Sequence, residues 1–465
     1  MQATTIDRLR AELGAIVRTD DGLLDKRRHD YWAVSHLRDW AGNPPSRPGC
    51  VVQPGSPQDV QRTIRVANRE GIAVMPYGLG SGVCGGILPT DDVLLLDLSS
   101  LNTTREIDEV NLLASFDAGK NGLEAEQEVA ALGLTIGHWP QSIALSSVGG
   151  WISTRASGQF STAYGNIEDI VYSIEAVLPN GDLVQLGKAP RAAAGPDLRH
   201  IVMGAEGTMG VVTGVTLSLR RAPEARRYSA FYADSMREGI AAQRSIVHAD
   251  WRPPVMRQYD HPEVKRNFRE HVDGEAALLL MVHEGPSGRV DAEIDDVTRI
   301  ATGAGLRAAD PIVCEEWMDR RNHVPTWRDF FEMGIVVDTI EISAPWSRID
   351  DLYDDAVGRL RALDGVVNAS AHSSHAYRSG INLYFSFAAR RDPAELEAAY
   401  FECWRAVMEA TVHNGGGVAH HHGAGRLRKP WIESDLGENG VALLRTLKSA
   451  IDPNGIMNPG NLIPD

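Results

Sequence analysis

Apolar residues recur along the first half of the chain in short runs separated by amphipathic segments. Residues 57–70 repeat apolar positions at helical spacing, with Ser56-Pro57 and Gly71 as typical start and stop signals of a helix. Three apolar runs are typical of buried strands: residues 72–78, 93–101 and 112–119. This alternation of strands and helices indicates an α/β or α+β domain.

Two further segments extend this first domain. Residues 123–132 predict a helix that ends at Gly133, and residues 164–187 predict a strand pair joined by Asn180-Gly181, a strong hairpin signal. At the N-terminus an amphipathic helix is predicted whose apolar face carries Ile6, Leu9, Leu13 and Ile16. The domain is expected to end near Arg220.

The second half of the chain predicts a separate sheet with covering helices. A basic, proline-containing connector at residues 220–228 leads into it. The expected strands are residues 228–233, 276–284 and 381–389, and the expected helices are residues 236–248 and 348–363. The tail from Glu395 onward predicts two helices on either side of a histidine-rich segment.

The composition agrees with a soluble protein of two domains. A chain of 465 residues exceeds what one hydrophobic core usually fills. The net charge of −16 repels nucleic acid phosphates and anionic membranes at long range, so nucleic acid is not expected as a partner. Four cysteines without a C-x-x-C pair are typical of a reducing compartment rather than of a disulfide scaffold or zinc site.

The apolar runs are too short for a signal peptide core or a membrane span. A cytoplasmic protein without an integral membrane segment is therefore expected, and peripheral contact with a membrane is left open. A homodimer is also expected.

Glycine-rich segments give the first indication of chemistry. In Val74 to Gly86 (VMPYGLGSGVCGG) an apolar run leads into glycines, whose backbone N–H groups can closely approach a diphosphate. The segment has neither the Lys-Ser/Thr of a P-loop nor the spacing of the dinucleotide fingerprint. Two more small-residue segments, residues 140–158 and 204–214, could wrap a long cofactor from other sides.

Together, PYGLGSGVCGG, SSVGGWISTRASG, YGNIEDIV and MGAEGTMGVVT resemble the FAD-binding domain of the vanillyl-alcohol oxidase (PCMH-type) superfamily. SVGGWISTRASG, YGNIED, ISAPW and HHHGAGRLRKPW most resemble the alkyldihydroxyacetonephosphate synthase family. The resemblance implies an α+β fold in which a two-subdomain PCMH-type FAD-binding domain is joined to an antiparallel-sheet cap domain covered by helices. The expected parts are an N-terminal helical segment (1–45), the FAD-binding domain (46–222), the cap domain (223–410) and a C-terminal segment that returns to the FAD-binding domain (411–465).

The resemblance also implies the cofactor and its site. Some relatives tether the flavin to a histidine early in the glycine-rich loop, where this chain has Ser81, Val83 and Cys84, so non-covalent FAD is expected. His138 is the alternative attachment point. The implied FAD-binding residues are Pro76, Tyr77, Gly78, Leu79, Gly80, Ser81, Gly82, Gln141, Ser142, Ser146, Ser147, Gly149, Gly150, Ser153, Thr154, Ser157, Glu206, Gly207, Gly210, Val211, Val212 and Asn461.

Three consecutive histidines, His420, His421 and His422, concentrate groups that transfer protons near neutral pH. A mononuclear metal site is the rival interpretation. Adjacent side chains on an extended segment point to opposite faces, so three consecutive histidines do not easily ligate one ion. Metal-binding relatives carry His-x-Gly-Asp-Gly-Asn-x-His where this chain has His-His-His-Gly-Ala-Gly-Arg, so no metal is expected. In the synthase family the equivalent triple histidine is required for activity.

Tyr384 is the second catalytic candidate. On a strand it shares the polar face with Asn382 and Ser386, opposite apolar neighbours, which is consistent with a positioned acid, base or hydrogen-bond donor. A tyrosine packed at a strand edge is the alternative. The resemblance implies that Tyr384 is the catalytic tyrosine of the synthase family and that Ser386 opens the pocket where relatives carry an aromatic residue.

Cationic residues suggest an anionic small-molecule substrate. The resemblance implies that Arg328 contacts the substrate near the flavin and that Arg257 lines the same site. A guanidinium group binds carboxylate or phosphate through two parallel hydrogen bonds. Arg426, Arg428 and Lys429 follow the histidines and are expected to add to an anion-binding surface.

Three functions follow from these residues. The synthase-like interpretation predicts exchange of the acyl group of an acyl-dihydroxyacetone phosphate for a fatty alcohol through a flavin adduct, with no net redox change. The alternative is an FAD-dependent oxidase or dehydrogenase that acts on a 2-hydroxy acid or an alcohol. A non-catalytic flavin-binding protein is disfavoured by the clustered proton-transfer residues.

Overall fold

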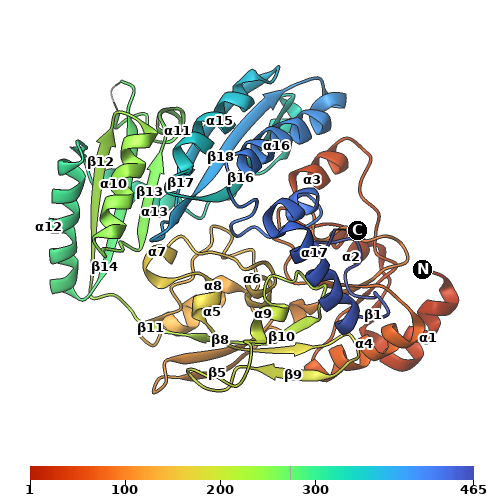
Figure 1. Ribbon diagram of the computed structural model, residues 1–465. Helices are drawn as coiled ribbons and strands as arrows, with labels where there is room; N and C mark the ends of the chain where they lie inside the picture. The colour runs from red at the N-terminus through yellow and green to blue at the C-terminus, as the bar shows by residue number, and fades with distance from the viewer. Residues whose placement is uncertain (273, 465) are drawn as a thin grey trace.

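The short apolar runs of the first half build a small, mostly parallel sheet. The computed structural model describes residues 1–272 and 274–464 (Figure 1). The sheet has the order β1-β2-β4-β3, in which β4 pairs in parallel with both of its neighbours. Its strands are β1 (Val17–Arg18), β2 (Cys50–Val52), β3 (Val74–Tyr77) and β4 (Leu94–Asp97).

The crossover helix of this sheet is α4 (Pro57–Glu70). Its bounds confirm the sequence prediction. The Ser56 hydroxyl accepts a hydrogen bond from the Asp59 N–H, and Gly71 ends the helix in the left-handed conformation at φ 65°. Helix α1 (Ala3–Leu13) packs against α4 through its buried residues Leu9 and Leu13.

A second, antiparallel sheet of order β5-β6-β10-β8-β9 completes the first domain. The predicted hairpin is confirmed, because β8 pairs with β9 across Asn180-Gly181 and Gly181 has φ 84°. The edge strand β5 was not predicted, since its sequence TREID is polar and partly exposed. The strands are β5 (Thr104–Asp108), β6 (Leu113–Asp117), β8 (Val171–Val177), β9 (Leu183–Leu186) and β10 (Val211–Ser218).

Short helices and a minor strand pair surround these two sheets. The serine- and glycine-rich segment forms α6, which begins after Ser147 and packs against β6 and β10. The minor elements are α2 (Asp21–Lys26), α3 (Ala33–Trp40), α5 (Gly122–Ala130), α6 (Val148–Thr154), α7 (Ser161–Tyr164), α8 (Ile167–Ile170), α9 (Arg199–Val202), β7 (Leu134–Thr135) and β11 (Arg220–Arg221).

The second half forms one seven-stranded antiparallel sheet of order β15-β12-β14-β13-β17-β18-β16. The predicted connector was partly wrong, because β12 already begins at Ala225 and pairs along its whole length with β14. The strands are β12 (Ala225–Ala233), β13 (Val255–Tyr259), β14 (Ala277–Gly285), β15 (Arg307–Ala309), β16 (Ile335–Pro345), β17 (Val366–Ser373) and β18 (Gly380–Arg390).

Helices cover both faces of this cap sheet, which explains why residues 277–282 of β14 are all apolar and buried. Leu279 and Met281 pack with the outer helices α10, α12, α15 and α16, whereas Leu278 and Leu280 pack with α11 and α13 on the face toward the first domain (Figure 1). The helices are α10 (Met236–His248), α11 (His261–Asn267), α12 (Ser287–Gly303), α13 (Ile312–Arg320), α14 (Arg328–Glu332), α15 (Ile349–Ala362) and α16 (Leu396–His413).

The C-terminal segment returns to the first domain. After the histidine-rich loop, α17 (Ile432–Ile451) bends at Gly437, whose φ of 70° is not helical. Beyond α17, Val74 donates a backbone hydrogen bond to Ile456 and accepts one from Asn458, each at 2.8 Å. Within the described residues, no helix combines the length and apolar character needed to cross a bilayer.

Candidate active site

A large cavity lies between the first domain and the inner face of the cap sheet. Its volume of about 1160 Å³ exceeds the range of roughly 300 to 1,000 Å³ that is typical for one small ligand. Every residue that the sequence predicted to bind FAD lines this cavity, from Pro76 in β3 to Asn461 near the C-terminus. The space is therefore sufficient for a long cofactor together with a small substrate.

The glycines of the predicted diphosphate loop are needed for their small size. A Cβ atom on Gly78 would lie 2.5 Å from the Ser147 hydroxyl oxygen, and a Cβ atom on Gly80 would overlap the Tyr77 hydroxyl. Gly80 also has φ 74°, which is the left-handed conformation. The backbone N–H groups of this loop and the serine hydroxyls around α6 form a donor set that fits a diphosphate. The residues present thus fit FAD.

Glu206 ties the C-terminal segment to this cradle. Its buried carboxylate accepts hydrogen bonds from the backbone N–H groups of Ala424 (2.6 Å) and Gly425 (2.9 Å) and from the Asn461 side chain (3.0 Å). Burial raises the pKa of Glu206, and these donors oppose that effect. Glu206 and Asn461 both line the cavity, so the loop that follows the histidines is fixed against the predicted cofactor site.

His138, the alternative attachment point for flavin, is not among the residues that line the cavity. Its ring is fully buried against Trp151, with 4.6 Å between the ring centroids, and burial lowers its pKa to about 3. Non-covalent binding of FAD stays a prediction.

The conformation of the histidine segment depends on one buried carboxylate, Glu341 in β16. It accepts hydrogen bonds from the backbone N–H groups of His420 (2.7 Å), His421 (3.2 Å) and His422 (2.7 Å). The Arg428 guanidinium, which is also fully buried, donates to it at 3.0 Å. Burial disfavours ionisation of Glu341, but Arg428 and the imidazoles outweigh burial and hold its pKa well below the usual range.

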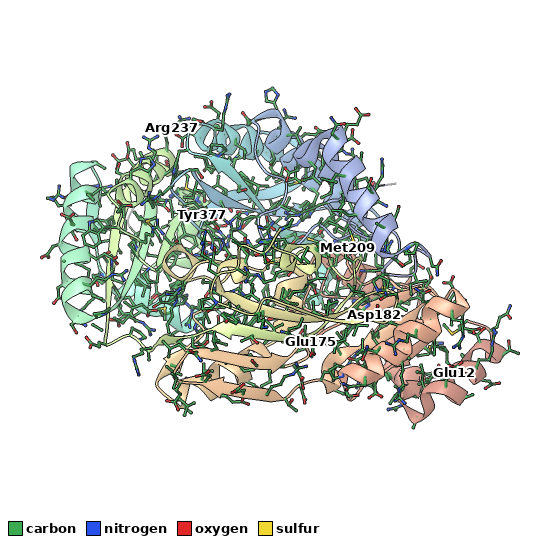
Figure 2. All side chains as sticks on the ribbon, turned by 60° about the horizontal axis from the view of Figure 1, so that its bottom comes forward. Glu12, Glu175, Asp182, Met209, Arg237 and Tyr377 are labelled. Carbon is green, nitrogen blue, oxygen red and sulfur yellow. The ribbon has the colours of Figure 1, made fainter. Side chains whose placement is uncertain are left out.

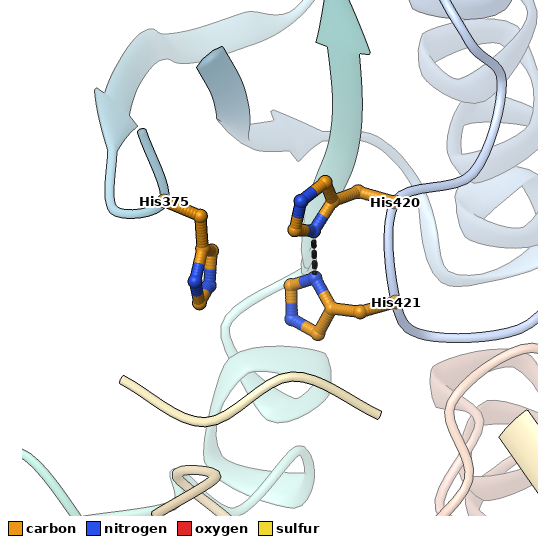
Figure 3. A group of neighbouring side chains, drawn as sticks. All are labelled: His375, His420 and His421. Atoms are coloured by element: carbon orange, nitrogen blue, oxygen red, sulfur yellow. Dashed lines mark hydrogen bonds between the residues drawn. The ribbon is translucent and has the colours of Figure 1, made fainter. Parts of the chain in front are cut away.

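Because three consecutive N–H groups converge on Glu341, the segment is not extended and its side chains converge as well. The Nδ1 atoms of His420 and His421 lie 2.6 Å apart (Figure 3). His375, from the loop after β17, faces the pair with its ring centroid 5.0 Å from each of theirs. The premise that adjacent histidines point to opposite faces is therefore wrong for His420 and His421.

The ring nitrogens of His420 and His421 already have partners. The Nε2 atom of His421 lies 2.6 Å from the Tyr384 hydroxyl, and the Nε2 atom of His420 lies 2.7 Å from the Tyr377 hydroxyl. Side-chain nitrogens of His375, His420 and His421 lie within 4.8 Å of one another, a spacing that could hold a metal ion. An ion bound there would have to displace the hydrogen bonds of His420 and His421 to each other and to the two tyrosines. The absence of a metal stays a prediction.

Burial keeps these groups neutral near pH 7. It lowers the pKa of His420 and of His422 to about 4 and that of His421 well below its ordinary value, against the opposing charge of Glu341. Neighbouring imidazoles add to the lowering of the pKa at His420 and His421. Burial raises the pKa of Tyr384, while the positive charge of Arg257 acts in the opposite direction. A neutral imidazole is thus available to accept the Tyr384 proton.

The ring of Tyr384 is held on the cavity wall as the sequence predicted. Leu383 and Phe385 face the apolar core, whereas Tyr384 and Ser386 face the cavity. His372 stacks on the Tyr384 ring with 4.7 Å between centroids, and Glu263 in turn holds the Nδ1 atom of His372 at 2.8 Å. The stacked His372 ring and the hydrogen bond to His421 therefore position the phenol of Tyr384.

The cationic residues divide between the cavity and other places. Arg257 lines the cavity, donates to the Tyr259 hydroxyl at 2.9 Å and lies over the Trp317 ring. Contrary to the prediction, the structure does not bring Arg328 into the cavity. Its side chain is 76% exposed and pairs with Glu332 one helical turn further on, because α14 turns Phe330 toward the cavity instead.

The predicted anion-binding surface after the histidines is also corrected. Arg428 is fully buried, where it pairs with Glu341 and donates to the Val418 carbonyl at 2.7 Å. Arg426 donates to the Pro459 carbonyl at 3.0 Å, and Lys429 lies 3.5 Å from the Gly460 carbonyl. These residues hold the C-terminal segment together and do not form one anion site.

Several residues of the site were missed in the sequence. His372, His375 and Tyr377 form a run of proton-transfer side chains (HSSHAY) directly before the strand of Tyr384, and this density was the available signal. Glu341 stands in the apolar strand IVVDTIEISAPW, where a charged residue is rare unless it is paired.

Comparison with known proteins places the chain among flavoenzymes. Residues 48–187 match the family described as FAD binding domain, and residues 222–462 match the family described as FAD linked oxidases, C-terminal domain. The chain is 32% identical over 484 residues to the uncharacterized FAD-linked oxidoreductase YgcU of Escherichia coli (strain K12), covering 100% of the chain and 99% of that protein.

Two further comparisons concern one enzyme. The chain is 28% identical over 458 residues to alkyldihydroxyacetonephosphate synthase of Dictyostelium discoideum, covering 91% of the chain and 74% of that protein. A solved structure of an alkyldihydroxyacetonephosphate synthase superimposes with a TM-score of 0.81 at 26% identity, covering 99% of this chain and 85% of the other. Both likenesses extend through the first domain and the cap.

Replacing Glu341 by Gln tests its role in shaping the histidine segment. The substitution leaves the Arg428 guanidinium buried without its counter-charge, so we expect the free energy of unfolding to fall by about 3–5 kcal/mol. Glu332→Gln removes the partner of the exposed Arg328 and should cost at most about 1 kcal/mol. Urea unfolding followed by circular dichroism measures both, and equal losses in the two variants would contradict the role of Glu341.

Replacing Gly80 by Ala tests the predicted diphosphate cradle. The new methyl group would overlap the Tyr77 hydroxyl in a left-handed backbone, so we expect purified Gly80→Ala to retain far less FAD than the unaltered protein. Gly42→Ala is the matched control, because Gly42 has φ 77° but no atom within 4 Å of its Cβ position. Flavin absorbance per polypeptide is the measurement. Full FAD content in Gly80→Ala would place the cofactor elsewhere.

Proposed function

The chain belongs to the FAD-linked oxidases of the PCMH type, and from this membership we propose that it oxidises a small anionic molecule at a hydroxyl-bearing carbon, with FAD as the acceptor. The observation that carries the proposal is the 2.6 Å contact between the Tyr384 hydroxyl and a neutral His421 on the cavity wall. This contact supplies a base where such a substrate would lie.

Tyr384 takes the proton of the substrate hydroxyl. As the substrate O–H proton moves to the phenol oxygen, the phenol passes its own proton to the Nε2 atom of His421. Tyr384 therefore never has to become a free phenolate, which burial would strongly disfavour. Base catalysis by a positioned side chain of this kind contributes roughly 10²- to 10⁴-fold to a rate.

FAD, when bound by the cradle around Gly80 and Ser147, supplies the acceptor for the hydride that leaves the substrate carbon. In this oxidation the substrate carbon loses a hydride, the substrate oxygen loses a proton to Tyr384, and a carbonyl group forms. The protein has to hold the hydroxyl against Tyr384 while the carbon faces the flavin.

Arg257 orients the substrate through its anionic group. It lines the cavity beside Tyr259, and its positive charge acts on Tyr384, His372 and His375. A guanidinium group this close to the base can hold the carboxylate of a 2-hydroxy acid or a phosphate. The same charge stabilises the negative charge that develops on the substrate oxygen.

A second candidate function is the ester-to-ether exchange of the synthase family. It is favoured by the convergence of Tyr384 with His420, His421 and His422, the residues that the resemblance carries over from that family. The surface position of Arg328, which that family uses near the flavin, counts against it. Both functions begin with proton removal by Tyr384, so they differ in the substrate rather than in the base.

Anaerobic spectroscopy of the FAD-loaded protein separates the two functions. We expect that a panel of 2-hydroxy acids, phenolic alcohols and dihydroxyacetone phosphate esters contains a hydroxy acid or alcohol that bleaches the oxidised flavin. Formation of an ether lipid from a phosphate ester and a fatty alcohol, without net flavin reduction, would support the exchange instead. An inert flavin together with no exchange across the panel would overturn both functions.

Replacing Tyr384 by Phe tests the base with whichever substrate reduces the flavin. The variant cannot pass a proton to His421, so we expect flavin reduction in stopped flow to slow by roughly 10²- to 10⁴-fold. The FAD content should not change. Tyr172→Phe is the control, since Tyr172 donates to the Lys188 carbonyl and neither residue lines the cavity. An unchanged rate in Tyr384→Phe would exclude it as the base.

A further inference from the structure

The hydrogen bonds of the site continue past His421 to a second tyrosine. From Tyr384 they run to His421 (2.6 Å), between the two Nδ1 atoms to His420 (2.6 Å), and on to the Tyr377 hydroxyl (2.7 Å). The Tyr377 hydroxyl lies 3.3 Å from the Asn166 Oδ1 atom of the first domain. Figure 2 shows Tyr377 where the cap sheet meets that domain.

We propose that Tyr384, His421, His420 and Tyr377 form a proton relay, and that Tyr377 is the relay residue that exchanges protons with solvent. The proposal rests on the proposed function, because it names where the proton goes that Tyr384 removes from the substrate. Tyr377 acts through His420 and His421 and does not itself contact the substrate.

Donation runs in one direction at a time through all four residues, and the direction that starts at Tyr384 leaves its oxygen free to accept the substrate proton. A neutral imidazole carries one N–H and one free nitrogen. Tyr384 donates to Nε2 of His421, Nδ1 of His421 donates to Nδ1 of His420, and Nε2 of His420 donates to Tyr377. Both rings are held neutral by burial, so each link has one donor and one acceptor.

One substrate proton passes through the relay without leaving a charge on it. The proton enters at the Tyr384 oxygen, and the proton of each group moves one link onward. The Tyr377 oxygen receives the His420 proton and releases its own on the side of Asn166. Tyr377 and Asn166 are both partly exposed, whereas His421 is buried, so the relay leads from the cavity wall toward water. The starting pattern is restored when Tyr377 takes up a proton from water and the relay runs in reverse, which delivers one proton to the cavity for reoxidation of the flavin by an electron acceptor.

The rings are held in place for this role. His375 stacks on His420, and the Nδ1 atom of His375 is held by the Ser161 hydroxyl at 2.5 Å. Glu341 fixes the backbone of His420 and His421 through their N–H groups. These contacts leave the rings little freedom to rotate away from one another.

The kinetic test uses Tyr377→Phe in the FAD-loaded protein with a substrate that reduces the flavin. We expect flavin reduction to slow by roughly ten- to a hundredfold, less than for Tyr384→Phe because the base itself remains. In the unaltered protein, a plot of the flavin-reduction rate against the fraction of D₂O should be curved, since several protons move together. The same plot for Tyr377→Phe should be less curved. Tyr172→Phe should behave as the unaltered protein. An unchanged rate and curvature in Tyr377→Phe would overturn the relay.

A second measurement needs no substrate and so separates failure of the relay from failure of the proposed function. In protein labelled with ¹⁵N-histidine, we expect a strongly low-field proton signal from the short Nδ1–H···Nδ1 bond and one Nε2–H tautomer for His420. Tyr377→Phe should shift both signals, and Tyr172→Phe should shift neither. A doubly protonated imidazole or an unchanged His420 signal in Tyr377→Phe would overturn the relay, even if no substrate is found.

Metal analysis provides the remaining contrast. If His375, His420 and His421 ligate an ion, purified protein should contain about one metal per chain, and His375→Ala should lose it. Stoichiometric metal that persists in Tyr377→Phe would overturn the relay. Metal-free protein with the expected proton signals would support it.

Discussion

The site depends on the burial of one carboxylate, that of Glu341, within the cap sheet. A buried carboxylate is costly unless donors surround it, and here three consecutive backbone N–H groups and the Arg428 guanidinium do so. That requirement bends the chain around a single point. The bend turns the His420 and His421 side chains toward one another, which an extended segment could not do. The arrangement of the proton-transfer groups is thus a consequence of satisfying Glu341.

Hydrogen bonds between buried or partly buried polar groups also join the two domains around the cavity. Glu206 of the first domain binds the backbone directly after the histidines, and Ser161 and Asn166 of the first domain contact His375 and Tyr377 of the cap. The predicted cofactor cradle and the proton-transfer groups therefore belong to one connected network. A change in the relative position of the domains would disturb both, so the cavity is a joint property of the two sheets.

The sequence predicted those features that depend on local chemistry. Helix α4 followed from Ser56 and Gly71, the hairpin from Asn180-Gly181, and the cavity-facing side of β18 from alternation around Tyr384. It failed where long-range contacts decide the outcome. The convergence of His420 and His421 depends on Glu341, almost eighty residues earlier in the chain, and no local pattern reveals that pairing. No local pattern distinguishes Arg328 from Arg428, yet Arg328 pairs with Glu332 on the surface and Arg428 pairs with Glu341 in the core.

Neutrality is the property that lets this network serve chemistry rather than only structure. Protonated imidazoles so close together would repel one another, and burial removes the water that would screen them, so His420 and His421 each keep one proton near pH 7. A pair in which each ring both donates and accepts can pass a proton on without holding a charge. The positive charges nearby, Arg257 and Arg428, lie beside the network and are not members of it. They can therefore stabilise anions, on the substrate and on Glu341, without interrupting the path of the proton.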